Sequence, residues 1–163
     1  MRAARFSTTL LCTLCVAAAL AACRSKPPSK AVPAVAVVSL SARPDTNPGP
    51  DGRPSPIVLR LYLLKSDAAF TNADYFPLFD DEARVLGADL LSREEQQLIP
   101  GQTFSVEIPL ATETRFIGFA GGYYDTSRTL WRAVTPAPGN KGHSVRIVAV
   151  AERARVTVSV VPR

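Results

Sequence analysis

The fold class of this chain is decided by the stretch Ile57-Val58-Leu59-Arg60-Leu61-Tyr62-Leu63-Leu64-Lys65. Apolar side chains recur there at every second position, and this period of two is typical of a half-buried β-strand. The opposite face of the predicted strand carries Arg60 and Tyr62. The inward face carries Ile57, Leu59, Leu61 and Leu63.

Further strands are predicted on both sides of this stretch. The segment 115–124 is apolar on both faces, as a central strand is. Within 103–108 the inward residues would be Phe104, Val106 and Ile108. In the last strand they would be Val156, Val158 and Val160. The additional strands are 35–40, 103–108, 115–124, 144–151 and 155–161. Their regular spacing predicts a mostly β domain folded as a two-sheet β-sandwich.

Two short helices are predicted directly after the stretch 57–65. Ser66 can accept a hydrogen bond from a free amide in the first turn of a helix that begins at Asp67. Asn72 or Asp74 can cap a second helix, running toward residue 79. That helix is expected to be short or distorted, because Pro77 has no amide hydrogen to donate.

A third helix is predicted from Ser92-Arg93-Glu94-Glu95, which has the serine and glutamate spacing of a capping box. Pro100-Gly101 would end it. Residues 97–99 also fit a strand, and the pattern does not decide between the two.

The first 22 residues have the features of a secretory signal. Two arginines make a positive start, residues 6–20 are apolar and uncharged, and small residues follow. The apolar run is shorter than the roughly 20 residues of a transmembrane helix. Leu20-Ala21-Ala22-Cys23 matches the bacterial lipobox, so we expect cleavage before Cys23 and acylation of its thiol. The alternatives are a plain signal peptide or an inner-membrane anchor, with the cysteine there by chance.

Residues 24–33 are a polar, proline-bearing tether that could extend roughly 30 Å at about 3.3 Å per residue. By the bacterial sorting convention, Arg24 in place of aspartate after the cysteine favours the outer membrane. Several acyl chains on Cys23 would anchor the chain firmly. The predicted organisation is a signal peptide (1–22), a lipidated tether (23–33) and a β-sandwich domain (34–163).

Cysteine usage and charge exclude several classes of protein. Cys12 and Cys15 have redox-motif spacing but would leave with the signal peptide. The one remaining thiol would be acylated, so no disulfide is expected. Loss of two arginines with the signal lowers the formal charge from +5 to +3. Without basic runs interleaved with aromatic residues, nucleic acid is not an expected partner.

No set of catalytic or metal-ligating residues stands out. His143 is the only histidine and is expected in an exposed turn. Asp80-Asp81-Glu82 could attract Ca²⁺, but no regular calcium loop surrounds them, so a solvated helix end is preferred and the question stays open. Gly118, Gly121 and Gly122 fit close packing or a bulge better than a phosphate loop. The sequence thus predicts no enzyme, no cofactor and no metal site.

A periplasmic carrier or ligand-binding lipoprotein is the alternative function. Trp131 and Tyr123-Tyr124 could line its site, although core packing is the expected role of these aromatic residues. A carrier would need a sizeable apolar pocket with a few polar groups. A hydrolytic enzyme, the other alternative, would need an acid–base pair that the sequence does not show.

The most unusual segment is the loop Ala42–Pro56, which joins two predicted strands and contains five prolines. It exceeds the two to five residues of a simple hairpin, and its prolines lower the entropy lost when it is captured. We therefore expect recognition of a partner rather than an inert linker, with the loop outside the core. Arg53 is the expected contact, since a guanidinium suits a carboxylate or carbonyl. The alternative is that Arg53 only shapes the loop by pairing with Asp51 or Asp45.

A series of short motifs follows in order along the mature chain. They are Asn47, Asp51-Gly52-Arg53-Pro54-Ser55-Pro56, Val58 to Lys65, Phe70, Ala73-Asp74-Tyr75-Phe76, Leu78-Phe79, Leu86-Gly87-Ala88-Asp89-Leu90-Leu91, Pro100-Gly101 and Trp131-Arg132. In this order, and together with the lipobox, they resemble the TssJ (SciN) family of type VI secretion outer-membrane lipoproteins from residue 34 to about residue 162. The departures are Pro77, where the family tends to continue a helix, and Gly121-Gly122, where it is often alanine-rich.

The resemblance implies a sandwich of transthyretin-like or C2-like type with short added helices, and no catalysis. It implies a structural lipoprotein on the periplasmic face of the outer membrane that holds the periplasmic domain of the inner-membrane protein TssM, with TssL in the same complex. In the family, the loop between the first two strands has been linked to TssM binding. The expected partner-binding residues here are Arg43, Asp45, Asn47, Asp51, Gly52, Arg53 and Pro54.

Replacing Cys23 with serine tests the predicted anchor. Serine offers no thiol for acylation, so we expect an uncleaved or soluble periplasmic species. Fractionation of the cell envelope measures this, and recovery of the variant in the outer-membrane fraction would contradict the prediction.

Overall fold

The computed structural model describes residues 34–138 and 145–161. The predicted signal peptide, Cys23 and the tether lie outside these residues. So do His143 and most of the turn predicted at 138–142.

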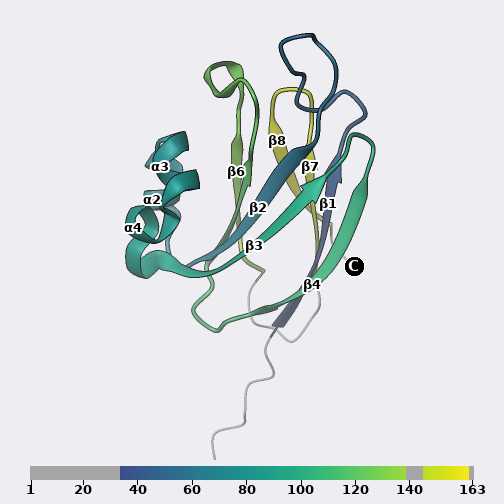
Figure 1. Cartoon of the computed structure of the whole chain (residues 1–163). Helices are drawn as coiled ribbons and strands as arrows, with labels where there is room; N and C mark the ends of the chain where they lie inside the picture. The colour runs from purple at the N-terminus through teal and green to yellow at the C-terminus, as the bar shows by residue number, and fades with distance from the viewer. Residues whose placement is uncertain (1–33, 139–144, 162–163) are drawn as a thin grey trace, which may run out of the picture. The chain divides into compact units, whose positions relative to one another are not determined.

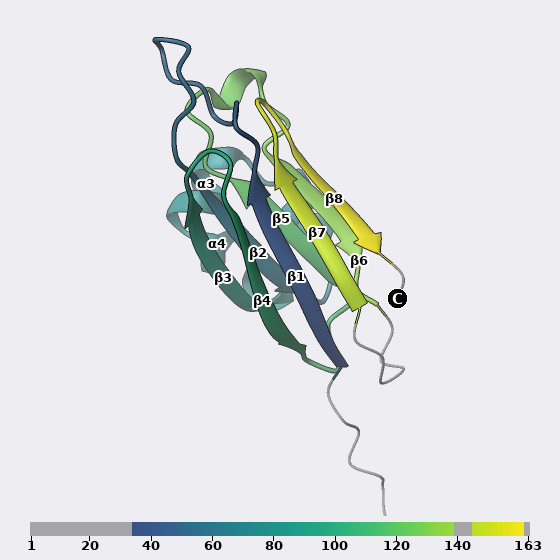
Figure 2. The same ribbon diagram turned by 90° about the vertical axis from the view of Figure 1, so that its right-hand side faces the viewer.

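Eight strands form two four-stranded sheets that pack face to face (Figures 1 and 2). The strands are β1 (Ala34–Ala42), β2 (Ile57–Leu64), β3 (Leu90–Leu98), β4 (Thr103–Leu110), β5 (Phe116–Gly121), β6 (Arg132–Pro136), β7 (Val145–Ala151) and β8 (Val156–Val161). The first sheet has the order β4-β1-β7-β8, with β1 antiparallel to β4 and parallel to β7. The second has the order β3-β2-β5-β6 and is antiparallel. The predicted two-sheet sandwich is confirmed.

Short helices follow β2 and lie against the outer face of the second sheet (Figure 1). They are α2 (Ala68–Asn72), α3 (Tyr75–Asp80), α4 (Glu82–Leu86) and the 3-10 turn η1 (Gly87–Asp89). As predicted, the Ser66 hydroxyl accepts a hydrogen bond from an amide of the first turn, that of Ala68 at 3.3 Å. The helix begins at Ala68, one residue later than predicted, and Asp67 holds the N-cap position. Asp74 occupies the N-cap position of α3 without a side-chain cap bond. Pro77 lies in the first turn of this helix, where an amide has no intrahelical partner, so proline is tolerated there.

The inward-facing side chains of β2, which alternate as predicted, fill the space between the two sheets. Leu59 and Leu61 are fully buried and belong to one apolar cluster with Val38 of β1 and Ile147 of β7. The inward sides of both sheets therefore form the main core of the domain.

The other face of β2 is buried as well, because the helices cover its second half. Tyr62 and Leu64 form a second apolar cluster with Phe70 of α2, Leu78 of α3 and Leu86 of α4. The rings of Tyr62 and Phe70 are 5.4 Å apart. This strand therefore connects the two cores.

Gly118 in β5 allows the helical layer to approach the sheet closely. A Cβ atom at this position would stand only 2.9 Å from two ring atoms of Phe70. The predicted close-packing role of the glycines is confirmed here and at Gly121, where a Cβ would stand 2.8 Å from the ring of Tyr123.

Four charged side chains fasten the helical layer to the edge of the second sheet. Arg60 of β2 binds Glu95 of β3 at 2.7 Å and Glu82 of α4 at 3.1 Å. Arg93 of β3 binds the same two carboxylates at 2.6 and 2.7 Å. The four residues form a closed ring of ion pairs, and networks of this kind contribute more than isolated surface pairs.

The prediction of a helix opened by Ser92-Arg93-Glu94-Glu95 is wrong, because these residues lie in the edge strand β3. The serine and glutamate spacing of a capping box is fulfilled, but Glu95 pairs across the strands with Arg60 instead of reaching back to an amide. Residues 97 and 98 belong to the same strand, which decides the ambiguity left at 97–99.

Two of the three residues in the acidic run 80–82 are engaged within the fold. Asp81 accepts a hydrogen bond from the amide of Arg84 at the start of α4, and Glu82 binds two arginines. Among the residues that the structure describes, no cluster of three or more potential metal ligands occurs.

Two predicted inward residues are more exposed than the alternation implies. Phe104 is 37% exposed and Val160 is 43% exposed, while Val158 is partly buried. Phe104 lies in β4 and the two valines lie in β8, the edges of the first sheet, where the facing sheet gives less cover.

Replacing Leu61 with aspartate should lower the free energy of unfolding by about 3–5 kcal/mol, because it buries an unpaired charge in the main core. The matched change Val158→Asp should cost less, since that side chain is partly exposed at a sheet edge. Urea denaturation of the purified domain compares the two. Equal stability of both variants and the parent would contradict the assigned core.

Replacing Gly118 with alanine should destabilise the domain by about 1–3 kcal/mol, because the new Cβ overlaps the ring of Phe70. A shorter side chain in Phe70→Leu should relieve the overlap, so the double variant should lose less than the two single changes together. Gly122→Ala is the control, since its Cβ would make an ordinary contact at 3.5 Å. Additive losses would refute the close-packing role.

Candidate partner-binding surface

Three loops that are far apart in the sequence meet at one end of the sandwich (Figure 1). They are the β1–β2 loop (43–56), the β5–β6 segment (122–131) and the β7–β8 hairpin (152–155). Strand pairing brings them together, because Ala42 lies opposite Ala151 in the first sheet and Leu59 lies opposite Gly121 in the second. We call this end of the domain the loop end.

The tip of the β1–β2 loop is a small hairpin of its own. Pro48 and Pro54 form a β-bridge, and the amide of Gly49 donates to the carbonyl of Arg53 at 2.9 Å. The amide of Gly52 closes a turn onto the carbonyl of Gly49, also at 2.9 Å. Gly52 has a φ of +77°, which side-chain-bearing residues rarely adopt, so glycine is required there. The loop therefore has a defined shape.

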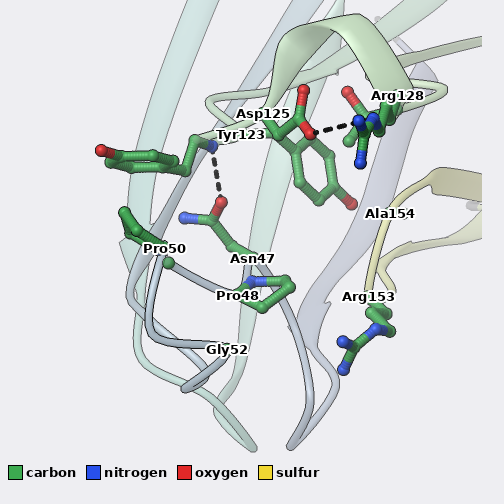
Figure 3. Close-up of a pocket in the computed structure, with 12 residues that line it drawn as sticks. Asn47, Pro48, Pro50, Gly52, Tyr123, Asp125, Arg128, Arg153 and Ala154 are labelled. Atoms are coloured by element: carbon green, nitrogen blue, oxygen red, sulfur yellow. Dashed lines mark hydrogen bonds and ion pairs between the residues drawn. The ribbon is translucent and has the colours of Figure 1, made fainter.

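Asn47 fixes the base of this loop. Its side-chain nitrogen donates to the carbonyl of Pro56 at 2.8 Å. Its side-chain oxygen accepts from the amide of Tyr124 at 2.7 Å (Figure 3). The residue is 5% exposed and has a φ of +49°, a backbone conformation that asparagine tolerates better than most residues. Asn47 thus joins the β1–β2 loop to the β5–β6 segment.

Two hydroxyl groups join the hairpin 152–155 to the other loops. Thr46 donates to the carbonyl of Glu152 at 3.1 Å, and the Tyr123 hydroxyl lies within hydrogen-bond distance of the carbonyls of Glu152 and Arg155. Burial, reinforced by the charge of Glu152, raises the pKa of Tyr123. The hydroxyl therefore stays protonated and keeps its hydrogen to donate.

The expectation that the loop lies outside the core is wrong for two residues at its base. Thr46 is fully buried and Asn47 nearly so, and both bind backbone groups of other loops. The exposed parts of the loop, on either side of this buried pair, are free to meet a partner. Asn47 therefore positions the loop, and its side chain offers little surface of its own.

The other predicted binding residues lie on the surface of the loop. They are Arg43, Asp45, Asp51, Gly52, Arg53 and Pro54. The guanidinium of Arg53 is 3.5 Å from the carboxylate of Asp51, and the Arg53 amide also donates to that carboxylate. The intramolecular pairing considered as the alternative for Arg53 is thus present, although both side chains remain mostly exposed.

A groove of about 700 Å³ opens between the three loops (Figure 3). The three loops together supply the prolines, tyrosines and charged side chains of its walls. They include Pro48, Pro50, Tyr123, Tyr124, Asp125, Arg128 and Arg153. Sequence reasoning missed the contributions of Asp125, Arg128 and Arg153, because only the strand order places these segments beside the β1–β2 loop.

The aromatic residues considered as a ligand site divide into three roles. Tyr123 packs against the core, as expected, whereas Tyr124 is 67% exposed on the groove. Trp131 packs edge-on against Tyr75, with the guanidinium of Arg132 over its ring at 4.5 Å.

None of the helices in the described residues has the length and hydropathy to cross a membrane.

The chain is similar to several solved structures. It is 36% identical to the type VI secretion lipoprotein TssJ1 of Pseudomonas aeruginosa, covering 81% of this chain and 99% of that one, with a TM-score of 0.75. It is 28% identical to Serratia marcescens Lip, a membrane-bound component of the type VI secretion system, covering 78% and 98%, with a TM-score of 0.72. A chain from the structure of the TssM C-terminal domain of EAEC shares the fold at 24% identity, covering 79% and 98%, with a TM-score of 0.60. Curated proteins gave no significant match.

The sequence also matches a protein-family model. The match covers residues 34–160, which is nearly all of the sandwich domain, and the model describes the type VI secretion lipoproteins VasD, EvfM and TssJ. Proteins of this family are structural components of the secretion system and not enzymes. The chain belongs to the type VI secretion lipoprotein (TssJ, SciN) family, whose members are membrane-associated lipoproteins.

Proposed function

We propose that the protein tethers the periplasmic domain of a TssM-like inner-membrane protein to the outer membrane. Acylated Cys23 is the anchor in this proposal, residues 24–33 are the tether, and the loop end binds the partner. Family membership supports a role in the type VI membrane complex. The similarity to the membrane-bound Lip supports attachment to a membrane. The similarity to a chain in the TssM C-terminal domain structure supports a TssM-like partner.

The observation that carries the proposal is the position of the loop end relative to the start of the domain. Ala34 begins β1, and the β1–β2 loop follows at the other end of this nine-residue strand. At about 3.3 Å per residue, the strand separates the two by roughly 30 Å. A tether attached at Ala34 would therefore leave the loop end directed away from the membrane, where a partner from the inner membrane can reach it.

The rigidity of the loop end supports recognition rather than passive linkage. Asn47 and Thr46 are bonded to two different loops, and the tip has its own backbone hydrogen bonds. A surface that is ordered before binding loses little conformational entropy when a partner docks. A carrier function has less support, because the groove is open and partly charged rather than an enclosed apolar pocket.

Replacing the tip Gly49-Pro50-Asp51-Gly52-Arg53 with Asn-Gly tests the proposal. Asn-Gly favours a two-residue turn and can keep Pro48 and Pro54 paired, so the fold and the Asn47 bonds should survive. We expect this variant to lose co-purification of the TssM-like periplasmic domain from envelope extracts and to stop secretion. Its melting temperature should stay close to that of the parent.

The matched control is replacement of the exposed residue Thr112, in the β4–β5 loop at the opposite end of the domain, with serine. This control should bind and secrete normally. If the tip variant is folded, reaches the membrane and still captures the partner at full strength, the proposed binding role of the β1–β2 loop is wrong.

A further inference from the structure

Arg153, at the tip of the β7–β8 hairpin, lines two neighbouring hollows of the loop end. One is the groove between the three loops (Figure 3). The other, of about 440 Å³, is lined by Arg43, Asp45 and the rest of the hairpin 152–155. The exposed guanidinium of Arg153 thus borders both hollows.

Most other charges near this arginine are paired within their own loops. The ion pairs are Arg53 with Asp51 at 3.5 Å, Arg155 with Glu152 at 3.3 Å, and Arg128 with Asp125 at 3.9 Å. Among the residues that the structure describes, Arg153 makes no ion pair and no side-chain hydrogen bond, and neither does Arg43.

The charges that remain give the loop end a positive character. In the second hollow, Arg43 and Arg153 face a single unpaired carboxylate, that of Asp45. In the groove, Asp125 is held by the amide and hydroxyl of Ser127, at 3.1 and 2.7 Å. Both hollows therefore have arginine charge left over, which complements an acidic group.

The opposite wall of the groove is apolar and exposed. Pro48 and Pro50 supply its aliphatic part, and Tyr124 is 67% exposed although its own amide is fixed by Asn47. Exposed tyrosine and arginine side chains on a rigid support are the residue types that dominate binding energy at interfaces. An occupant of this groove should thus carry an acidic group beside apolar side chains.

We propose that the groove receives a segment of the partner's periplasmic domain in which an aspartate or glutamate is flanked by apolar residues. Arg153 binds the carboxylate, and Tyr124 and Pro50 pack against the apolar neighbours. Guanidinium–carboxylate hydrogen bonds are charge-assisted and directional, so Arg153 fixes the register of the segment. This assignment rests on the proposed function, and replaces Arg53, which is already paired, as the main charged contact.

Substitution of Arg153 in the full-length lipoprotein tests the assignment. Co-purification with the TssM-like periplasmic domain should weaken at least about tenfold in Arg153→Glu and less in Arg153→Lys, which keeps the charge but loses the paired donors. Tyr124→Ala should also weaken capture. Arg146→Glu is the matched control, because Arg146 is exposed on β7, opposite Val161 and away from the loop end.

A charge-reversal screen then identifies the acidic partner residue. Arginine placed at one surface aspartate or glutamate of the TssM-like domain should restore capture by Arg153→Glu and weaken capture by the parent. Rescue at one position supports the assignment, and rescue at none overturns it. Melting temperatures of Arg153→Glu and Arg153→Lys show whether a loss of capture comes from unfolding. If Arg153→Glu is unfolded, Arg153→Gln takes its place.

The outcomes separate this assignment from the proposed function. If Arg153→Glu binds like the parent while the Asn-Gly tip variant does not bind, Arg153 is not the contact and the tethering function stands. If both variants bind like the parent, both the assignment and the loop end as the binding surface are wrong.

Discussion

The burial of β2 on both of its faces is the constraint on which the rest of the domain depends. Leu59 and Leu61 lie between the sheets, while Tyr62 and Leu64 lie beneath the helices. A strand with two buried faces requires a layer on each side of its sheet, so the short helices are part of the core and not an appendage. Individually these helices are far too short to be stable in water, and the apolar face they cover is what keeps them folded.

The same strand also explains the charge distribution on the helical side. Arg60 lies next to Tyr62 on the outward face of β2. Its ion pairs with Glu82 and Glu95 and its hydrogen bond to the carbonyl of Phe79 allow a guanidinium to remain at the margin of the second core. The guanidinium carbon of Arg60 also lies 4.5 Å from the centre of the Phe79 ring, so this side chain adds a cation–π contact to the helical layer. The helices are thus held to β2 in two ways, by apolar packing on Tyr62 and by the ion pairs of Arg60.

The sequence was sufficient for most of the sandwich, because a strand with one buried face has a period that can be recognised without knowing its neighbours. It failed at 92–95, where an edge strand and a helix start have the same residue pattern, and only the pairing with β2 decides between them. The candidate site was predictable only in its β1–β2 loop. Arg128 and Arg153 come from distant segments, and no local pattern shows that two sheets will place them beside Pro48 and Pro50.

The first sheet has a consequence for how the chain folds. Its strand β1 pairs with β4 on one side and, in parallel, with β7 on the other, so the start of the domain cannot complete its pairing until nearly the whole chain is available. Non-local pairing of this kind slows folding, because long loops must close before their contacts form. The first sheet can therefore close only after β7 and β8 are available. For a chain exported through its predicted signal peptide, this means after nearly the whole domain has crossed the membrane.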